Sequence, residues 1–154
     1  NYNDWIGGCV SSFVKALEDG VPPDIGVPSQ EPSRDVVMPY QNVTVWVNIT
    51  DAESGVESAT LYYDLNNSSA WTAVSMGYNS TSGLYNGSIP GQPEWTWVKF
   101  KIVAYDFAGN NATRDGVEVY CTYQVVPEFS SCHVLLLLVI LALSVVLCVR
   151  RKGL

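Results

Sequence analysis

The sequence contains a single histidine, His133, in a chain of 154 residues. His133 stands at the start of a long apolar run, so the residues before that run offer no histidine for Ser-His-Asp or Cys-His catalysis or for metal binding. The chain also lacks a Cys-x-x-Cys pair and a glycine-rich phosphate loop. Its acidic residues lie in polar turns, without the apolar surroundings that tune the carboxylates of glycosidases. We therefore expect no enzymatic activity, no cofactor and no resident metal.

Basic residues are scarce, with eight against fifteen acidic residues and a net charge of −7. All fifteen acidic residues but only five of the basic ones precede residue 131, so this part of the chain carries −10. A surface with this charge repels nucleic acid and anionic lipid. We expect no nucleic-acid partner.

Charged residues are absent from the apolar run 132–149. The run just reaches the length of about 17 to 20 residues that a helix needs to cross a bilayer. Arg150, Arg151 and Lys152 follow at once, and basic residues flank a span on its cytoplasmic side. We expect a transmembrane helix over 132–149, a basic cytoplasmic tail over 150–154, and the rest of the chain outside, at the cell surface.

Four cysteines are present, and two of them, Cys132 and Cys148, flank the apolar run. Cys9 and Cys121 lie on the expected outer side, where disulfides persist. Either these two residues form a bridge, or both remain thiols and one of them fills a strand position. The sequence leaves both alternatives open.

The acceptor pattern for N-glycans, Asn-x-Ser/Thr, occurs seven times, where chance would give about one or two. The acceptors are Asn42, Asn48, Asn66, Asn67, Asn79, Asn86 and Asn111. The patterns of Asn66 and Asn67 overlap, so crowding can leave one of them empty. A polar, turn-rich composition explains part of the excess. Because glycans are bulky and solvated, each acceptor that carries one must face outward.

Residues 1–20 have apolar side chains at helical spacing and end at Gly20, before two prolines. This amphipathic helix is either the end of an upstream domain or a helix that packs on the domain that follows it. The first residue is Asn1 and not methionine, which favours a longer protein. Five prolines in 21–40 indicate a linker that runs into an irregular first strand.

Short strands alternate with polar turns from residue 41 to residue 124. In 42–50 the aliphatic residues occupy every second position, so they share one face, and Trp46 shares the other with Asn42 and Asn48. Further strands are expected over 56–64, 70–76, 84–89, 97–106 and 113–123. No helical pattern separates them, which predicts an all-β, antiparallel, two-sheet sandwich.

Two motifs in this region resemble those of prokaryotic immunoglobulin-like, or fibronectin type III-like, surface domains. The turn Asp51-Ala-Glu-Ser-Gly-Val56, leading into Ala59-Thr-Leu-Tyr-Tyr63, is similar to one turn and strand of that class. Val103-Ala-Tyr-Asp106-Phe-Ala-Gly-Asn110 is similar to the hairpin near the end of such domains. Gly109 and Asn110 tolerate positive φ there, and Asp106 can accept backbone N–H bonds. The resemblance covers residues 24–123 and implies an immunoglobulin-like sandwich over 41–124, without the Cys-Trp-Cys core of antibody domains.

The juxtamembrane segment 125–131 contains Val126-Pro127-Glu128-Phe129, ahead of the apolar run and Arg-Arg-Lys. This order resembles the PEF-CTERM sorting signals of archaeal surface proteins. The resemblance implies that an archaeosortase-like transpeptidase recognises Pro127, Glu128 and Phe129, removes the span and attaches a lipid. The alternative is an ordinary permanent anchor.

Two binding activities compete with structural explanations of the same residues. Asp51, Glu53, Asp64 and Asp106 could hold calcium at one end of the sandwich, but calcium takes about six to eight oxygens, and turn capping is the preferred interpretation. Exposed aromatic residues could stack on sugars, as in carbohydrate-binding modules, but core packing and shielding by glycans are the preferred explanations. Trp46 and Trp71 are the rings to test.

These observations favour a non-catalytic, N-glycosylated, membrane-anchored module that acts as a stalk, adhesion or S-layer-like envelope component. Its expected partners are the membrane, a transpeptidase, and surface proteins or polysaccharides. One rival is that the chain tethers a larger secreted enzyme, such as a hydrolase, to the membrane. The other is a carbohydrate-binding module.

Overall fold

The computed structural model describes residues 18–115, 121–127, 139, 140 and 143. In these residues the chain is all-β, and every pair of strands is antiparallel. The expected helical segment 1–20 lies outside the described residues except at its last three positions, and the expected span 132–149 lies outside them except at 139, 140 and 143. The described residues contain no helix of the length and apolarity that a membrane crossing requires.

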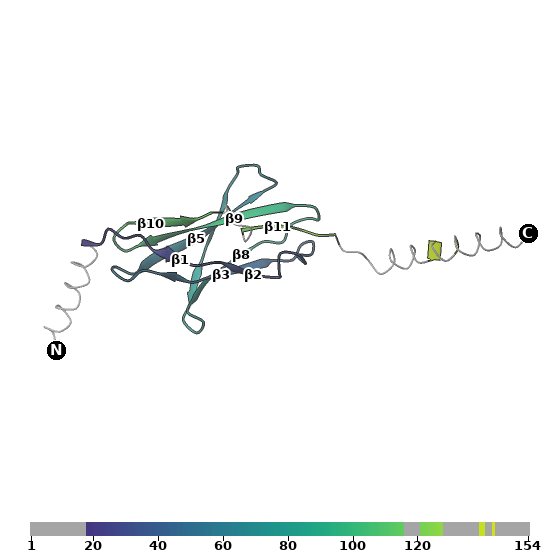
Figure 1. Cartoon of the computed structure of the whole chain (residues 1–154). Coiled ribbons are helices and arrows are strands. Elements are labelled where there is room, and N and C mark those ends of the chain that lie inside the picture. The colour runs from purple at the N-terminus through teal and green to yellow at the C-terminus, as the bar shows by residue number, and fades with distance from the viewer. Residues whose placement is uncertain (1–17, 116–120, 128–138, 141–142, 144–154) are drawn as a thin grey trace, which may run out of the picture.

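Two main sheets face each other across one core (Figure 1). The first has the order β10-β9-β5-β6, with β11 also paired to β9, and the second has the order β2-β3-β8-β7. A small third sheet pairs β1 with β4. The strands are β1 Asp24–Ile25, β2 Ser29–Glu31, β3 Val43–Val47, β4 Ile49–Thr50, β5 Val56–Leu65, β6 Thr72–Ser75, β7 Gly77–Asn79, β8 Leu84–Ile89, β9 Trp97–Asp106, β10 Asn111–Arg114 and β11 Thr122–Gln124.

The longest pairing joins β5 to β9, in register from Val56 opposite Asp106 to Leu65 opposite Val98. Along β9 every second residue, from Val98 to Asp106, is buried, and the residues between them are exposed or half-buried. This alternation follows from the period of two along a strand, and the strand expected over 97–106 is confirmed with the same bounds. The expected strand 84–89 is confirmed with the same bounds.

The expected strand 42–50 is divided at Asn48. β3 pairs with β2 and β8, whereas β4 pairs with β1 in the small sheet. The aliphatic residues of β3 and Ile49 are buried as expected, and Asn42 and Asn48 are exposed. Because the alternation continues through the break, the hydrophobic pattern alone cannot reveal the change of partner.

Two other expectations differ from the structure. The segment 77–83, expected as a turn, begins with strand β7, which the contact between the Tyr78 and Tyr85 rings holds on β8, with 5.1 Å between centroids. The expected strand 113–123 is instead two strands, β10 and β11, which pair with opposite ends of β9. Residues 116–120, between them, lie outside the described part of the chain.

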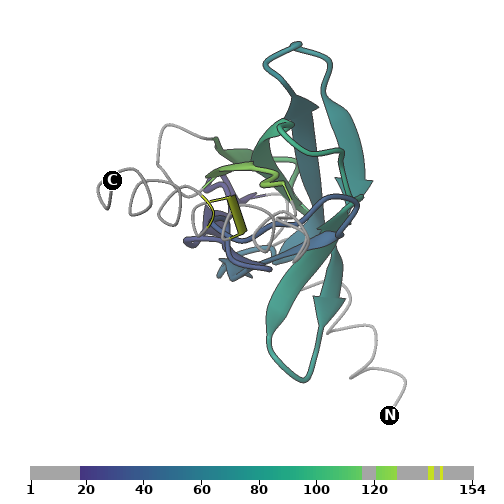
Figure 2. The same ribbon diagram turned by 90° about the vertical axis from the view of Figure 1, so that its right-hand side faces the viewer.

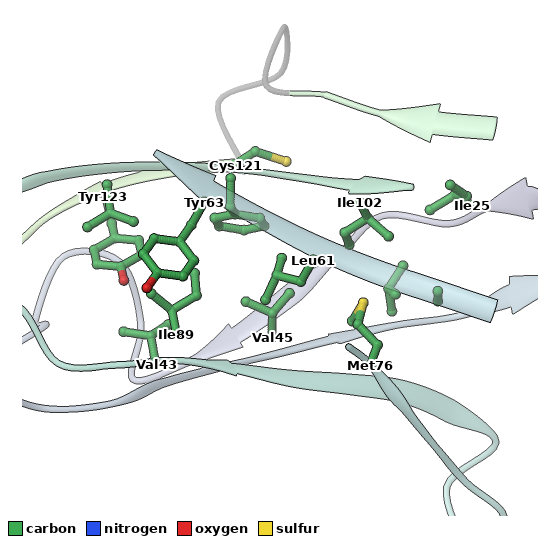
Figure 3. Packing of buried hydrophobic residues seen from close by; sticks show 14 of the residues in the cluster. Ile25, Val43, Val45, Leu61, Tyr63, Met76, Ile89, Ile102, Cys121 and Tyr123 are labelled. Atoms are coloured by element: carbon green, nitrogen blue, oxygen red, sulfur yellow. The ribbon is translucent and has the colours of Figure 1, made fainter. Parts of the chain in front are cut away.

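The core between the sheets is apolar and contains two tyrosines (Figure 3). Val43, Val45 and Ile89 contribute from the second sheet, and Leu61 and Ile102 from the first. Tyr63 and Tyr123 lie side by side at one end of this core, and burial, followed by the proximity of Tyr63, raises the pKa of Tyr123 far above its ordinary value. The neutral phenol is therefore the form that the core holds at all physiological pH values.

The chain approaches the sandwich at one end and leaves it at the other. The Asn110 side chain, just beyond the end of β9, donates to the carbonyl of Asp19 at 3.1 Å. Val125 exchanges backbone hydrogen bonds of 2.9 Å with Trp95 and Thr96, just before the start of β9. These two points lie at opposite ends of the described sandwich (Figure 1). The ten residues of β9 between them span roughly 30 Å.

Gly91 offers a test of this packing, because a Cβ placed there would overlap the backbone of Tyr40. We expect Gly91→Ala to lower the free energy of unfolding by about 1–3 kcal/mol, since backbone cannot move aside as a flexible side chain can. Gly77→Ala is the matched control, because a Cβ at Gly77 meets nothing within 4 Å. Urea unfolding of the full chain measures both variants. Equal midpoints for the two variants would contradict the close approach of Gly91 to Tyr40.

Candidate functional site

The seven expected glycan acceptors lie on the surface of the described structure. Six are exposed and Asn86, on β8, is half-buried. They do not form one cluster, because they are spread over both sheets and over the turns between strands. Glycan attachment requires exposure, and burial does not exclude sugar at the six exposed acceptors.

Three acceptors use their amide oxygen in the fold. The Oδ1 atoms of Asn42, Asn66 and Asn79 accept backbone N–H bonds of 2.9 Å from Gly91, Trp97 and Thr81. None of these bonds engages Nδ2, the atom to which a sugar would be joined. Sequence reasoning identified these residues by their acceptor pattern alone and gave no indication that Asn79 also stabilises a turn or that Asn42 and Asn66 bind segments far away in the sequence.

Asp51 holds the turn that precedes β5. Its Oδ1 accepts N–H bonds from Ser54 at 2.8 Å and from Gly55 at 2.6 Å. Gly55 adopts a φ of 87°, which a residue with a side chain rarely adopts. The Asp-x-x-Ser-Gly order is therefore explained by a carboxylate cap followed by a left-handed glycine.

Asp106 holds the hairpin between β9 and β10 and is fully buried. Its Oδ1 accepts N–H bonds from Ala108 at 2.9 Å and from Asn110 at 2.8 Å, and its Oδ2 accepts the Asn110 side-chain amide at 2.9 Å. These bonds confirm the expected role of Asp106 as an acceptor. Of the two positions expected to tolerate positive φ, only Gly109 adopts it, at 90°.

The structure brings the two aspartate turns together and adds a third carboxylate. Ligand oxygens of Asp19, Asp51 and Asp106 lie within 4.8 Å of one another. The Ser54 hydroxyl donates to Asp19, and the Phe107 N–H donates to the Gly55 carbonyl at 3.1 Å, so hydrogen bonds join all three segments. Sequence reasoning missed Asp19, because it stands at the end of a segment expected to be a helix.

The other two acidic residues proposed for the same end are not in this cluster. Glu53 is exposed on the turn. Asp64 lies near the far end of β5, opposite Lys99, so its expected position beside Asp51 was wrong. Seven residues of strand separate Asp64 from Val56, which pairs with Asp106.

The aspartate cluster can serve two chemical purposes. The observed bonds make it a set of turn caps, with backbone and side-chain donors that offset the repulsion between carboxylates. The same three carboxylates would supply only part of the roughly six to eight oxygens that calcium takes. Capping accounts for every hydrogen bond described above, and it remains the preferred interpretation.

Asp64 is a separate buried carboxylate, with 2% of its surface exposed. The Ser68 hydroxyl donates to it at 2.6 Å. This bond, the backbone N–H groups of Ser69 and Ala70, and the nearby Lys99 lower the pKa of Asp64 below its ordinary value, although burial opposes them. Asp64 therefore stabilises the β5–β6 turn in its ionised form.

The aromatic residues do not form one row. Trp46 lies on the outer side of β3, in the second sheet. Trp71 lies against the first sheet, with the ammonium groups of Lys101 and Lys99 at 4.4 and 5.3 Å from its ring centroid. A sugar platform that combines Trp46 with Trp71 is therefore not available within one sheet.

Several expected site residues lie outside the described part of the chain. Of the sorting motif only Pro127 is described, half-buried beside the end of β11, whereas Glu128 and Phe129 are not. The topology residues Arg150, Arg151 and Lys152 are also outside. Cys121 is buried in the core, and Cys9 lies outside the described residues, so a bridge between them stays a prediction.

The capping role of Asp106 predicts that Asp106→Ala destabilises the protein by about 1–3 kcal/mol, because buried N–H groups lose their acceptor. Asp24→Ala is the control, since Asp24 is exposed and makes no side-chain hydrogen bond to another described residue. Thermal unfolding with calcium and with a chelator measures both variants. If Asp106 acts only as a turn cap, Asp106→Ala loses the same amount of stability with calcium and with the chelator. A melting temperature of the wild type that falls on chelation would contradict that interpretation.

The lowered pKa of Asp64 predicts a pH-dependent stability. The stabilisation is present above the ordinary pKa of 3.8 and is lost as the pH falls through the lower pKa of the folded protein. We therefore expect wild type to be more stable than Asp64→Asn at pH 6, with the difference closing below about pH 4. Denaturant unfolding at a series of pH values measures this difference. A difference that stays constant down to pH 2.5 would rule out an ionised Asp64 as its source.

Comparison with known proteins adds no relative to this description. No protein-family model matches the chain, and no curated protein matches it significantly.

Proposed function

We propose that this protein is a non-catalytic, N-glycosylated spacer of the cell surface, an immunoglobulin-like module that the C-terminal span holds at the membrane. The observation that carries the proposal is the direction of the chain through the fold. Asp19 contacts the end of β9 and Val125 pairs beside its start, roughly 30 Å away. A module whose two connections lie at opposite ends extends whatever is joined to it away from the membrane.

The strand order supports an immunoglobulin-like assignment. Immunoglobulin-like sandwiches pair strands A-B-E-D in one sheet and C-F-G in the other. The orders β2-β3-β8-β7 and β6-β5-β9-β10 correspond to A-B-E-D and C′-C-F-G. Where antibody domains have a tryptophan on strand C, the equivalent strand β5 buries Leu61. Leu61 packs in the same core as Val45 of β3 and Ile102 of β9, which correspond to strands B and F.

The C-terminal connection supports a spacer because it is tied to the segment before β9 and to the segment between β2 and β3. Val125 bonds to Trp95 and Thr96 beside β9, and the Val126 N–H donates to the Val37 carbonyl at 2.9 Å. Val37 and Val125 are also buried in the core. The chain is thus held firmly up to the residue before Pro127, where the juxtamembrane segment begins.

The acceptors and the sorting-like segment extend the proposal to maturation. Exposed acceptors on both sheets would surround the spacer with glycan, which shields it from proteases and keeps neighbouring modules apart. We further propose that Pro127, Glu128 and Phe129 are read by an archaeosortase-like transpeptidase, so that the span 132–149 is a temporary anchor. The partners that follow are the membrane and this transpeptidase, and localisation is the outer surface.

Intact mass of the mature protein, purified from its own membrane, tests both parts of the proposal. We expect a mass above that of the polypeptide, with the excess removed by deglycosylation and by Asn→Gln changes at all seven acceptors. We also expect a C-terminus near Phe129 that carries lipid. A mass without sugar would overturn the glycosylated spacer, and a mature chain that ends at Leu154 would overturn sorting while leaving a permanent anchor. A catalytic domain joined before Asn1 would favour the enzyme tether.

A further inference from the structure

The overlapping acceptors Asn66 and Asn67 occupy the turn after β5. The Ser68 N–H donates to the Leu65 carbonyl at 3.1 Å, and Asn66 and Asn67 have φ values of 54° and 55°. This is the left-handed turn that suits tight hairpins, and asparagine tolerates it well. Asn66 uses Ser68 as its hydroxyl residue and Asn67 uses Ser69, so the two patterns have separate hydroxyls.

Asn66 is tied to the neighbouring strand by two hydrogen bonds. Its backbone N–H donates to the Trp97 carbonyl at 2.8 Å, and its Oδ1 accepts the Trp97 N–H at 2.9 Å. A transferase must draw the acceptor carboxamide into its own site, away from the surface of the substrate protein. For Asn66 this movement breaks the bond to Trp97.

The hydroxyl that belongs to Asn66 is also engaged. The Ser68 hydroxyl donates to Asp64 at 2.6 Å, and its oxygen accepts the Ala70 N–H at 3.3 Å. Asp64 is almost completely buried, so withdrawing this donor leaves a buried carboxylate short of a partner. Use of Asn66 therefore disturbs both the carboxamide and the hydroxyl of its pattern.

Within the described part of the chain, no such hydrogen bond restrains the carboxamide of Asn67 or the hydroxyl of Ser69. Both residues are exposed, and neither side chain makes a hydrogen bond to another described residue. Their turn projects from the body of the sandwich, at the top of Figures 1 and 2. An enzyme can reach this carboxamide and this hydroxyl without breaking a contact of the fold.

We propose that Asn67, and not Asn66, is the N-glycan acceptor of this pair in the folded protein, an inference that rests on the proposed glycosylation. The donor is an oligosaccharide joined to a lipid through phosphate. Nδ2 of Asn67 attacks the anomeric carbon, the bond from that carbon to the phosphate oxygen breaks, and the lipid phosphate leaves with the bonding electrons. Nδ2 loses one proton to a base of the transferase.

Site mapping by mass spectrometry after glycosylation in vitro tests this inference. The substrates are the folded, unglycosylated full chain and an unstructured peptide of residues 60–74, each with an oligosaccharyltransferase and a lipid-linked oligosaccharide. In the folded chain we expect about tenfold more sugar on Asn67 than on Asn66. Glycosylation of Asn66 disturbs the hydrogen bonds from Trp97 to Asn66 and from Ser68 to Asp64, whereas glycosylation of Asn67 leaves both intact. In the peptide we expect this preference to be lost.

The matched variant is Ser69→Ala, which removes the pattern of Asn67 and keeps that of Asn66. We expect it to lower glycosylation of the turn in the folded chain by about tenfold, to the level of Asn66, but to leave Asn66 fully active in the peptide. As much sugar on Asn66 as on Asn67 of the folded chain, or a folded chain modified elsewhere but not at Asn67, would overturn the inference and leave the proposed function intact. Failure of both substrates at every acceptor would overturn the glycosylated spacer itself, and the inference with it.

Discussion

The antiparallel pairing of β5 with β9 is the interaction on which the other features depend. Its inner side supplies Leu61 and Ile102 to the core, and its register determines what meets at each end. At one end Val56 opposite Asp106 brings the Asp51 turn against the β9–β10 hairpin. At the other end Leu65 opposite Val98 brings Asn66 against Trp97. A shift of register by one residue would separate both pairs and turn the buried side chains outward.

Much of this arrangement follows from the pattern of the sequence. The strand 84–89 was predicted with its bounds from the turn before it and the proline after it. The alternation of apolar and polar residues predicted 97–106 with the bounds that the structure has, because β9 buries one face and leaves the other partly exposed. The same rule fails for β7, whose residues are all exposed and are held by strand pairing and one ring contact. It also fails at Asn48, where the pairing partner changes and the burial period does not.

The candidate sites also contain some residues whose role the sequence predicts and others whose position it does not predict. The role of Asp106 was predictable, because an aspartate before Gly109 in a hairpin has local N–H groups to accept from. The position of Asp19 was not predictable, because Asp19 meets turns that are far away in the sequence. The position of Asp64 was not predictable either, because Asp64 lies at the end of β5 opposite to the end that meets Asp106. The difference between Asn66 and Asn67 is likewise invisible in the sequence, where both residues have a complete acceptor pattern.

The same pairing gives the proposed spacer a mechanical basis. A pull between the two connections acts along the strands, because Asp19 is bound beyond the end of β9 and Val125 is bound before its start. β11 lies antiparallel to β9, with Thr122 opposite Lys99 and Gln124 opposite Trp97, so a pull on the C-terminal side slides β11 along β9. Sliding loads the hydrogen bonds of the pair together, whereas peeling would load them one after another. A sandwich whose two chain connections lie at opposite ends is therefore suited to transmit force between a membrane and whatever is joined to its other end. A sandwich with both connections at one end is not suited to this.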